Sequence, residues 1–478
     1  MTSLERGSGA VGVADATAHP ASYRDPAGFV FTRDGVLYRQ VNSVGRSDYD
    51  ALMASGLYSA LAGAGDLVAH EEVDPGLSLD GDAYRVIRPA RVGFVSYPYE
   101  WAFSQLKDAA LHTLRLQKAA MQHGMSLKDA TAYNITFDAG RPVFIDTLSF
   151  EPLQTRRPWV AYLQFCQSFL APLALMSVVD VRLGHLQRSL LDGVPLDLAS
   201  RLLPWSSRFR PGLLVHVHLH AAAQRKLAGH APARRDGRVG AHTIPAIVDS
   251  LERTVRSLDW TPHGTVWGDY YAATNYSDGS FEHKRQIVQD AVDRLRPRSV
   301  WDLGANDGTF SRLASDRGIP TVAFDVDPVA VEKNYRRASA ASERHVLPLL
   351  LDLTNPSGAY GWANEERDAL ATRGPADLAL LLALVHHLAI AHNVPLERIA
   401  EYVARLARTI VIEFVPKADS QVQRMLASRE DIFDSYTQDG FERAFGARFT
   451  IEETIPVRES VRTIYVMRRR EPAGERDA

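Results

Sequence analysis

Carboxylates and glycines are spaced for ligand binding in residues 299–310, which read SVWDLGANDGTF. An apolar run ends at Asp302, and the glycines that follow, Gly304 and Gly308, carry no Cβ to hinder the approach of a ligand to the backbone. A second apolar run ends at Asp325, whose carboxylate could accept hydrogen bonds from both hydroxyls of a ribose. Strand, glycine turn, helix and acid-ended strand together predict a site for a nucleoside-bearing ligand, with the helix N-terminus facing it.

The spacing of these residues excludes the usual dinucleotide fingerprint, G-x-G-x-x-G. Counted from Gly304, its second and third glycine positions hold Asn306 and Thr309, so a nicotinamide-dependent dehydrogenase is disfavoured. The pattern Asp302-x-Gly304-x-Asn306-x-Gly308 instead resembles motif I of the class I methyltransferases that depend on S-adenosylmethionine (SAM), in which glycine usually stands where Asn306 does. The resemblance implies SAM as the cofactor, held by these residues and by the acid that ends the second strand.

Later segments extend this resemblance in chain order. Asp352, at the end of a predicted third strand, stands where the family has the acid that meets the adenine amino group, and Asp327 is a second candidate for the ribose or a helix N-cap. A fourth apolar run ends in His386-His387-Leu. The predicted fold class is α/β: a Rossmann-like seven-stranded sheet with helices on both faces, preceded by an α+β domain. The strands expected after motif I lie within residues 321–325, 349–352, 376–388, 409–415, 449–452 and 462–467.

The chemistry implied by the resemblance makes modest demands on side chains. Methyl transfer from a sulfonium is an in-line displacement at an activated carbon, so the protein has mainly to bind, align and desolvate its reactants. No metal is required, and the sequence predicts none. His386 and His387 lie at the carboxyl end of a predicted strand, the edge that faces the ligand crevice in open α/β sheets. One of them could be a general base, or both could shape the pocket wall and hydrogen-bond to backbone.

Two further groups of residues are candidates for the same site. Tyr276, Phe281 and Lys284 precede motif I, where the family often has a lid over SAM; they could contact cofactor or substrate, or pack as ordinary apolar and helical residues. Glu413 and Lys417 flank the end of the fifth strand. They could orient an acceptor, and a surface ion pair is the alternative.

The N-terminal half contains a second set of polar residues at suggestive spacing. Asp129 and Asn134 are followed, after a short turn and an apolar run, by Asp146. The arrangement resembles the catalytic and metal-binding loops of the protein-kinase and aminoglycoside-phosphotransferase superfamily. The resemblance implies that Asp129 aligns an acceptor hydroxyl, while Asn134 and Asp146 hold Mg²⁺ with ATP. The alternative is that Asp129 and Asn134 cap a turn, as these residue types often do.

The same half departs from the kinase pattern at several positions. Leu127 stands where the family has histidine, Thr147 follows the last acid where protein kinases have Phe-Gly, and no glycine-rich phosphate loop precedes the first hairpin. Arg39 occupies the position expected for the strand lysine, and Glu71 and Glu72 are the carboxylates nearest to it in sequence. A kinase-like fold without phosphotransfer is therefore an alternative to an active kinase.

Composition narrows the class of protein. A chain of 478 residues exceeds the size at which single cores stop growing, so two domains are expected. The net charge of −3 does not indicate the excess of basic residues that is typical of a protein with a nucleic-acid partner. The single cysteine excludes an intrachain disulfide and any cysteine-based metal cluster. Neither a membrane-spanning run nor a signal peptide is recognisable, which predicts a cytoplasmic protein.

The predicted function is transfer of a methyl group from SAM to a small-molecule or glycan acceptor. The glycan expectation comes from the whole-chain arrangement, which resembles bacterial two-part methyltransferases of a nodulation-related kind. A bifunctional kinase–methyltransferase and a SAM-binding pseudokinase scaffold without turnover are the alternatives. The predicted domains are a disordered N-terminus (1–22), an α+β domain that could be kinase-like (23–225), a linker (226–245), the methyltransferase domain (246–468) and a disordered tail (469–478).

Overall fold

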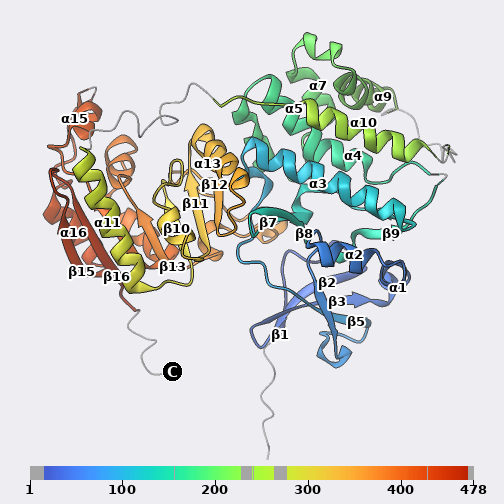
Figure 1. Ribbon diagram of the computed structural model, residues 1–478, viewed down its shortest axis with the longest axis horizontal. Coiled ribbons are helices and arrows are strands. Elements are labelled where there is room, and N and C mark those ends of the chain that lie inside the picture. Colours follow the sequence, from blue (N-terminus) through green and yellow to red (C-terminus); the bar gives the residue numbers. More distant parts are fainter. Residues whose placement is uncertain are drawn as a thin grey trace, which may run out of the picture.

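The computed structural model describes residues 16–155, 157–227, 240, 242–262, 277–427 and 429–471. Most of the predicted linker, most of the predicted disordered ends and Tyr276 lie outside these residues. An N-terminal half of strands and then helices lies beside a C-terminal half built on one large sheet (Figure 1). No helix within the described ranges is both long enough and apolar enough to cross a bilayer.

The C-terminal sheet has seven strands in the order β12-β11-β10-β13-β14-β16-β15, which confirms the predicted Rossmann-like fold. The first five are parallel, and β16 and β15 are antiparallel. The chain leaves β10 toward β11 on one side and later returns to β13 on its other side, so a ligand crevice is expected where these strands end. The strands are β10 Val300–Leu303, β11 Thr321–Asp325, β12 Val346–Leu350, β13 Ala376–Leu381, β14 Ala407–Phe414, β15 Phe449–Pro456 and β16 Thr463–Arg469.

Helices cover both faces of this sheet because successive strand residues point to opposite sides. Leu378 and Leu380 of β13 pack in one apolar cluster with Val288 of α11. Ala379 and Leu381 of the same strand belong to the other cluster, with α14 and α16. The helices of this half are α11 Asp278–Leu295, α12 Arg312–Ser315, α13 Pro328–Ala340, α14 Leu396–Leu406, α15 Ser420–Leu426 and α16 Gln438–Gly446.

The N-terminal half is α+β, as predicted. Its antiparallel sheet has the order β1-β2-β3-β5-β4, and the hairpin between β2 and β3 turns at Asp34 and Gly35, both at positive φ. Two short ladders, β6–β9 and β7–β8, lie beyond the long helix α3. The strands are β1 Ala16–Ala18, β2 Gly28–Arg33, β3 Val36–Asn42, β4 His70–Val73, β5 Ala83–Pro89, β6 Met125–Leu127, β7 Ile135–Asp138, β8 Arg141–Phe144 and β9 Phe150–Pro152.

Helices make up the remainder of this half. The longest of them is α3, and the chain leaves it through Gly124 at a φ of +71°. The α-helices are α1 Arg46–Ala54, α2 Leu57–Ala64, α3 Phe103–Gln122, α4 Tyr162–Phe165, α5 Ala171–Val178, α6 Leu186–Ser189, α7 Leu196–Leu202, α8 Pro211–Leu213, α9 His220–Leu227 and α10 Thr243–Ser257.

Helix α10 packs on the N-terminal half, which differs from the domain boundary predicted at residue 246. Its buried residues Val248 and Leu251 belong to the apolar cluster that also contains α3. Lys118 of α3 bonds Asp249 (Nζ–Oδ1 2.6 Å) and Glu252 (Nζ–Oε2 2.5 Å) of α10. Figure 1 shows the two helices side by side, whereas α11 lies against the C-terminal sheet. Helix α10 therefore packs with the N-terminal half.

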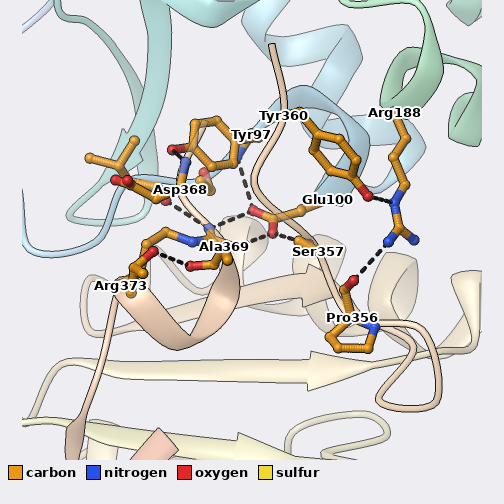
Figure 2. Close-up of polar contacts among 12 residues, drawn as sticks. Tyr97, Glu100, Arg188, Pro356, Ser357, Tyr360, Asp368, Ala369 and Arg373 are labelled. Atoms are coloured by element: carbon orange, nitrogen blue, oxygen red, sulfur yellow. Dashed lines mark hydrogen bonds and ion pairs between the residues drawn. The ribbon is translucent and has the colours of Figure 1, made fainter. Parts of the chain in front are cut away.

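A buried polar junction joins the halves. The Glu100 carboxylate lies between the Arg373 guanidinium (Oε2–Nη1 2.8 Å) and the Ser357 hydroxyl (Oε1–Oγ 2.8 Å), as Figure 2 shows. Arg188 reaches across from the N-terminal half to the Tyr360 hydroxyl and the Pro356 carbonyl. Glu100 lies between β5 and α3, and Arg373 and Ser357 belong to the segment between β12 and β13. That segment begins directly after β12. The junction therefore also holds in place one wall of the candidate site described below.

Candidate functional site

A cleft of about 230 Å³ lies at the carboxyl edge of the C-terminal sheet. Five of the six predicted cofactor residues line it: Asp302, Gly304, Asn306, Asp325 and Asp352. The sixth, Gly308, is not part of the lining. The remaining lining is formed by Phe281, Lys284, Ala305, Phe310, Phe324, Val326, Leu351, Leu353, Thr354, Leu382, Ala383, Leu384, His387, Leu388 and His392.

The motif I turn uses its two glycines differently. Gly304 has a φ of +83° and faces the cleft. Gly308 has a φ of +77°, and a Cβ there would lie 2.5 Å from Asn334 Nδ2 and 2.6 Å from Arg312 Nη1. The Arg312 guanidinium donates to the Gly308 carbonyl (3.0 Å), so this glycine lets the turn close against buried side chains rather than against a ligand. Arg312 and Asn334 were not recognised in the sequence because neither belongs to the motif.

The structure corrects the expectation of a helix N-terminus at the ligand. Residues 306–311 form turns, and regular helix begins only with the four-residue α12 at Arg312. Asn306, at a φ of +51°, occupies the middle of the turn and lines the cleft. Single backbone groups of the turn, rather than a helix dipole, therefore face the ligand site.

Asp325 lies at the floor of the cleft, at the end of β11. Its Oδ2 accepts a hydrogen bond from the Asn306 amide (2.8 Å), and its Oδ1 accepts one from the Asp327 amide (2.9 Å). Each oxygen keeps a further lone pair that could accept a ribose hydroxyl. Burial raises the pKa of Asp325 to about 6, so the carboxylate is mostly ionised at pH 7. Asp327 caps α13 through the Val329 amide (2.8 Å) and is not part of the cleft lining, which favours its N-cap alternative.

Asp302 is buried at the end of β10. Its Oδ2 accepts a hydrogen bond from the Ser311 hydroxyl (2.7 Å), which fixes the end of the motif I turn. Burial, together with the nearby Asp325 carboxylate, raises the pKa of Asp302 to about 7. The two acids are close enough to influence each other's protonation, so the charge of the cleft floor depends on pH near neutrality.

Asp352 follows β12 at the other end of the cleft. Its Oδ1 accepts hydrogen bonds from the Thr354 amide (2.8 Å) and hydroxyl (2.6 Å), which hold it in a tight turn. Leu351 and Leu353 line the cleft beside it. An acid between two apolar side chains fits the adenine end of a nucleoside, as the sequence predicts.

The two candidate histidines separate in the structure. His387 lines the cleft, while His386 is buried outside the lining and its Nδ1 has no hydrogen-bond partner among the described residues. Burial lowers the pKa of both, that of His387 to about 4. A base with so low a pKa is weakly effective near pH 7, which favours the pocket-wall role for His387. His392 also lines the cleft and was not singled out in the sequence.

Lys284 and Glu413, far apart in the sequence, form a buried ion pair at the cleft wall. Their Nζ and Oε2 atoms lie 2.7 Å apart, and the same Oε2 accepts a hydrogen bond from the Ala383 amide (2.8 Å). Arg462 adds positive charge 3.7 Å from Glu413 Oε1 and is held by Asp419 (Nε–Oδ2 2.7 Å). Ala383 lines the cleft at a φ of +51°, so the pair fixes a strained part of its wall.

Of the other candidates named with Lys284 and Glu413, Phe281 lines the cleft and Lys417 does not. Phe281 lines the cleft beside Phe310, with ring centroids 5.6 Å apart. Lys417 bonds Asp431 (2.8 Å) and not Glu413, in agreement with the surface alternative for this lysine.

The kinase-like residues converge in the N-terminal half. Arg39 Nη1 lies 2.7 Å from Asp146 Oδ1, and Asp146 Oδ2 accepts a hydrogen bond from the Ser149 hydroxyl (2.7 Å). Asn134 donates to the same hydroxyl (3.1 Å). Burial raises the pKa of Asp129, and the neighbouring Asp146 carboxylate raises it further.

Local contacts also support the alternative that Asp129 caps a turn, and they show the same for Asp146. Asp129 accepts the Thr131 amide (3.0 Å) and Asp146 accepts the Leu148 amide (3.0 Å). The nearby carboxylates Glu71 and Glu72 pair with Arg88 and Arg85 instead of Arg39. The described parts of the chain contain no group of three or more His, Cys, Asp or Glu side chains arranged to hold a metal ion.

Comparisons with known proteins were made for the whole chain. No protein-family model matches it. The nodulation protein NoeA of Rhizobium meliloti (strain 1021) is 36% identical over 458 residues, which cover 94% of this chain and 96% of NoeA.

Similar solved structures cover less than half of the chain. WbdD is 16% identical with a TM-score of 0.28, over 44% of this chain and 43% of that chain. Magnesium protoporphyrin IX methyltransferase (ChlM) from Synechocystis PCC 6803, with bound SAM, is 16% identical with a TM-score of 0.29, over 42% and 89%. Likenesses this weak do not establish function. The extent and identity of the match to the nodulation protein do establish kinship, and the chain belongs to the NoeA family.

Proposed function

We propose that this protein is a SAM-dependent methyltransferase. The observation that carries the proposal is the position of Asp325, whose carboxylate is fixed by two backbone amides at the floor of the cleft. Gly304 leaves the backbone open beside it, and Asp352 lies at the apolar end of the same cleft. These residues support the proposal because their chemistry matches the ribose and the adenine of SAM along one cleft.

The residues of this chain would act by binding and alignment. Asp325 would accept the ribose hydroxyls, and the Leu351 and Leu353 side chains would enclose the adenine beside Asp352. Lys284 and Glu413 would hold the wall at Ala383 in place. When bound, SAM supplies an activated methyl carbon, and exclusion of water by the cleft's apolar lining favours the displacement.

The acceptor is proposed to be a small molecule or a glycan. The whole chain has a net charge of −3, which does not favour a nucleic-acid acceptor. The relative that covers nearly the whole chain is named a nodulation protein, which is compatible with the glycan expectation.

Calorimetric titration of S-adenosylhomocysteine (SAH) tests the proposal. Two charge-assisted hydrogen bonds, each contributing about 1.5–3 kcal/mol, would be lost in Asp325→Ala, so SAH should bind at least about 100-fold more weakly. Asp377→Ala removes a partly buried carboxylate at the amino end of β13, the end away from the cleft, and serves as the control with unchanged affinity. Absence of SAH binding by the wild type, or equal affinity in Asp325→Ala, would contradict the proposal.

A second candidate function is phosphotransfer by the N-terminal half, which would make the protein bifunctional. The convergence of Arg39, Asp129, Asn134 and Asp146 favours it. The residues do not form a ready Mg²⁺ site, however, because the Arg39 guanidinium already neutralises Asp146. We therefore rank this function below methyl transfer.

ATP turnover in the presence of Mg²⁺ tests the second candidate. Phosphotransfer predicts turnover by the wild type that is lost in Asp129→Asn, while SAH affinity is unchanged. Absence of turnover would assign Asp129 and Asp146 to the turns that they cap. A protein that binds SAH but methylates no acceptor would correspond to the scaffold alternative.

A further inference from the structure

Helices α7 and α9 lie at the end of the N-terminal half that is away from the C-terminal sheet (Figure 1), and several large apolar side chains in this region of the chain are exposed. Trp205 and Phe209 are 68% and 70% exposed, and Leu202 is 42% exposed. Val215 and Leu219, on the next helical segment, are also exposed. These five side chains are called the Trp205 patch.

The patch is presented by packed structure. It is carried by α7, by a 3₁₀ segment (Trp205–Phe209) and by a π-helical segment (Leu214–Leu219). The buried His218 ring ties all three together, because its two nitrogens lie 2.8 Å from the hydroxyls of Ser200 and Ser207. The Trp205 and Phe209 rings meet edge to face, with centroids 4.8 Å apart. Two large aromatic rings are thus held at the surface by a hydrogen-bonded scaffold.

The sequence that carries most of the patch is basic. From Leu198 to Leu227 the sequence contains four arginines and one lysine but no aspartate or glutamate, although the whole chain carries a net charge of −3. Arg208 and Arg210 flank Phe209, are exposed, and form no ion pair within the described residues. Arg201 pairs with Asp197, at the start of α7. The surface therefore combines apolar rings with uncompensated positive charge.

We propose that the Trp205 patch docks on an anionic phospholipid surface. Tryptophan and phenylalanine rings gain free energy at the boundary between headgroups and acyl chains, and arginines beside them are attracted to negative headgroups. An apolar patch of this kind marks an interaction site in general. Arg208 and Arg210 lie in a stretch, residues 198–227, that contains no aspartate or glutamate, so a negative headgroup surface could approach them without repulsion from that stretch. The proposal concerns peripheral contact and is independent of the methyltransferase assignment.

Flotation of the full chain with vesicles tests this proposal. The wild type should bind phosphatidylcholine vesicles that contain phosphatidylglycerol, should bind pure phosphatidylcholine vesicles far less, and should dissociate as salt is raised. Trp205→Ser/Phe209→Ser should bind at least about tenfold more weakly. The double variant Arg208→Gln/Arg210→Gln should bind the anionic vesicles more weakly, by about fivefold for each arginine, and its binding should depend less on salt.

A matched control is available in the other half of the chain. Trp362 is 72% exposed and far from the patch in sequence, so Trp362→Ser should bind vesicles as the wild type does. The arginine variant keeps the test valid if the aromatic variant does not fold. Failure of the wild type to bind anionic vesicles, or wild-type binding by both double variants, would overturn the proposal. Binding that Trp362→Ser weakens equally would also overturn it.

Discussion

Arg373→Met should strongly destabilise the folded protein by breaking the junction between the two halves. The Arg373 and Glu100 side chains are only 4% and 1% exposed, and the guanidinium contacts both carboxylate oxygens. Removing one partner of a buried pair typically costs about 3–5 kcal/mol, because the remaining charge is left without compensation. Glu100 would retain the Ser357 hydroxyl (2.8 Å) and the Tyr97 amide (3.0 Å), which places the expected loss near 3 kcal/mol.

Urea denaturation followed by tryptophan fluorescence and far-UV circular dichroism measures this loss. Arg298→Met is the matched control, since its arginine is 83% exposed in the pair with Asp377 and should contribute no more than about 1 kcal/mol. Glu100→Gln/Arg373→Met removes both charges and should recover part of the stability. The reasoning is refuted if Arg373→Met loses no more stability than Arg298→Met.

The same variant should also affect the cofactor site. Arg373 and Ser357 belong to the segment that starts at Asp352 and Thr354, which line the cleft. If the junction loosens, this wall loses its support, and we expect SAH to bind several-fold more weakly to Arg373→Met than to Arg298→Met. Calorimetry of folded protein at low temperature separates this effect from unfolding.

Three further predictions concern the cleft. Lys284→Met should destabilise the protein by up to about 3 kcal/mol and weaken SAH binding, because the buried Glu413 would lose the cation 2.7 Å away and retain Arg462 at 3.7 Å. Arg285→Met, at an exposed neighbour, should leave both urea midpoint and affinity unchanged. Gly308→Ala should lower the denaturation midpoint more than Gly304→Ala, since both have positive φ but only at position 308 does the new Cβ meet atoms within 3 Å. SAH affinity should fall as the pH is lowered through about 6, where Asp325 gains a proton and accepts hydrogen bonds less well, by up to about tenfold per pH unit. Calorimetry at pH 5 to 8 would show this, and a flat profile would contradict the role of this carboxylate.

Local patterns in the sequence predicted the C-terminal fold well. Apolar runs that end in acids at Asp302, Asp325 and Asp352 marked three adjacent strands, because a strand buried on both faces is apolar along its length and polar only where it reaches the edge. The carboxyl ends of parallel strands share that edge, so these acids had to meet. The hairpin at Asp34 and Gly35 was equally local, since its turn requires residues that tolerate positive φ.

Contacts between distant segments were decided only by tertiary structure. Lys284 and Glu413 were each recognised, but nothing in their spacing showed that they pair, and the same holds for Arg39 and Asp146. The placement of α10 on α3 likewise depended on which apolar surface it covers. His386 and His387 are adjacent in sequence, yet the course of the chain after β13 places only His387 on the cleft.

The sequence by itself thus determined the elements and the edge at which the acids gather, since hydrophobic periodicity and turn residues act over a few neighbours. The tertiary structure decided which charges are buried together, which of the two glycines faces a ligand, and that Glu100 and Arg373 join the halves. Burial raises the pKa of Asp302 and Asp325 toward neutrality, and burial is a property of the packed molecule. Charge pairing and pKa shifts depend on desolvation by segments hundreds of residues away, which no local pattern encodes.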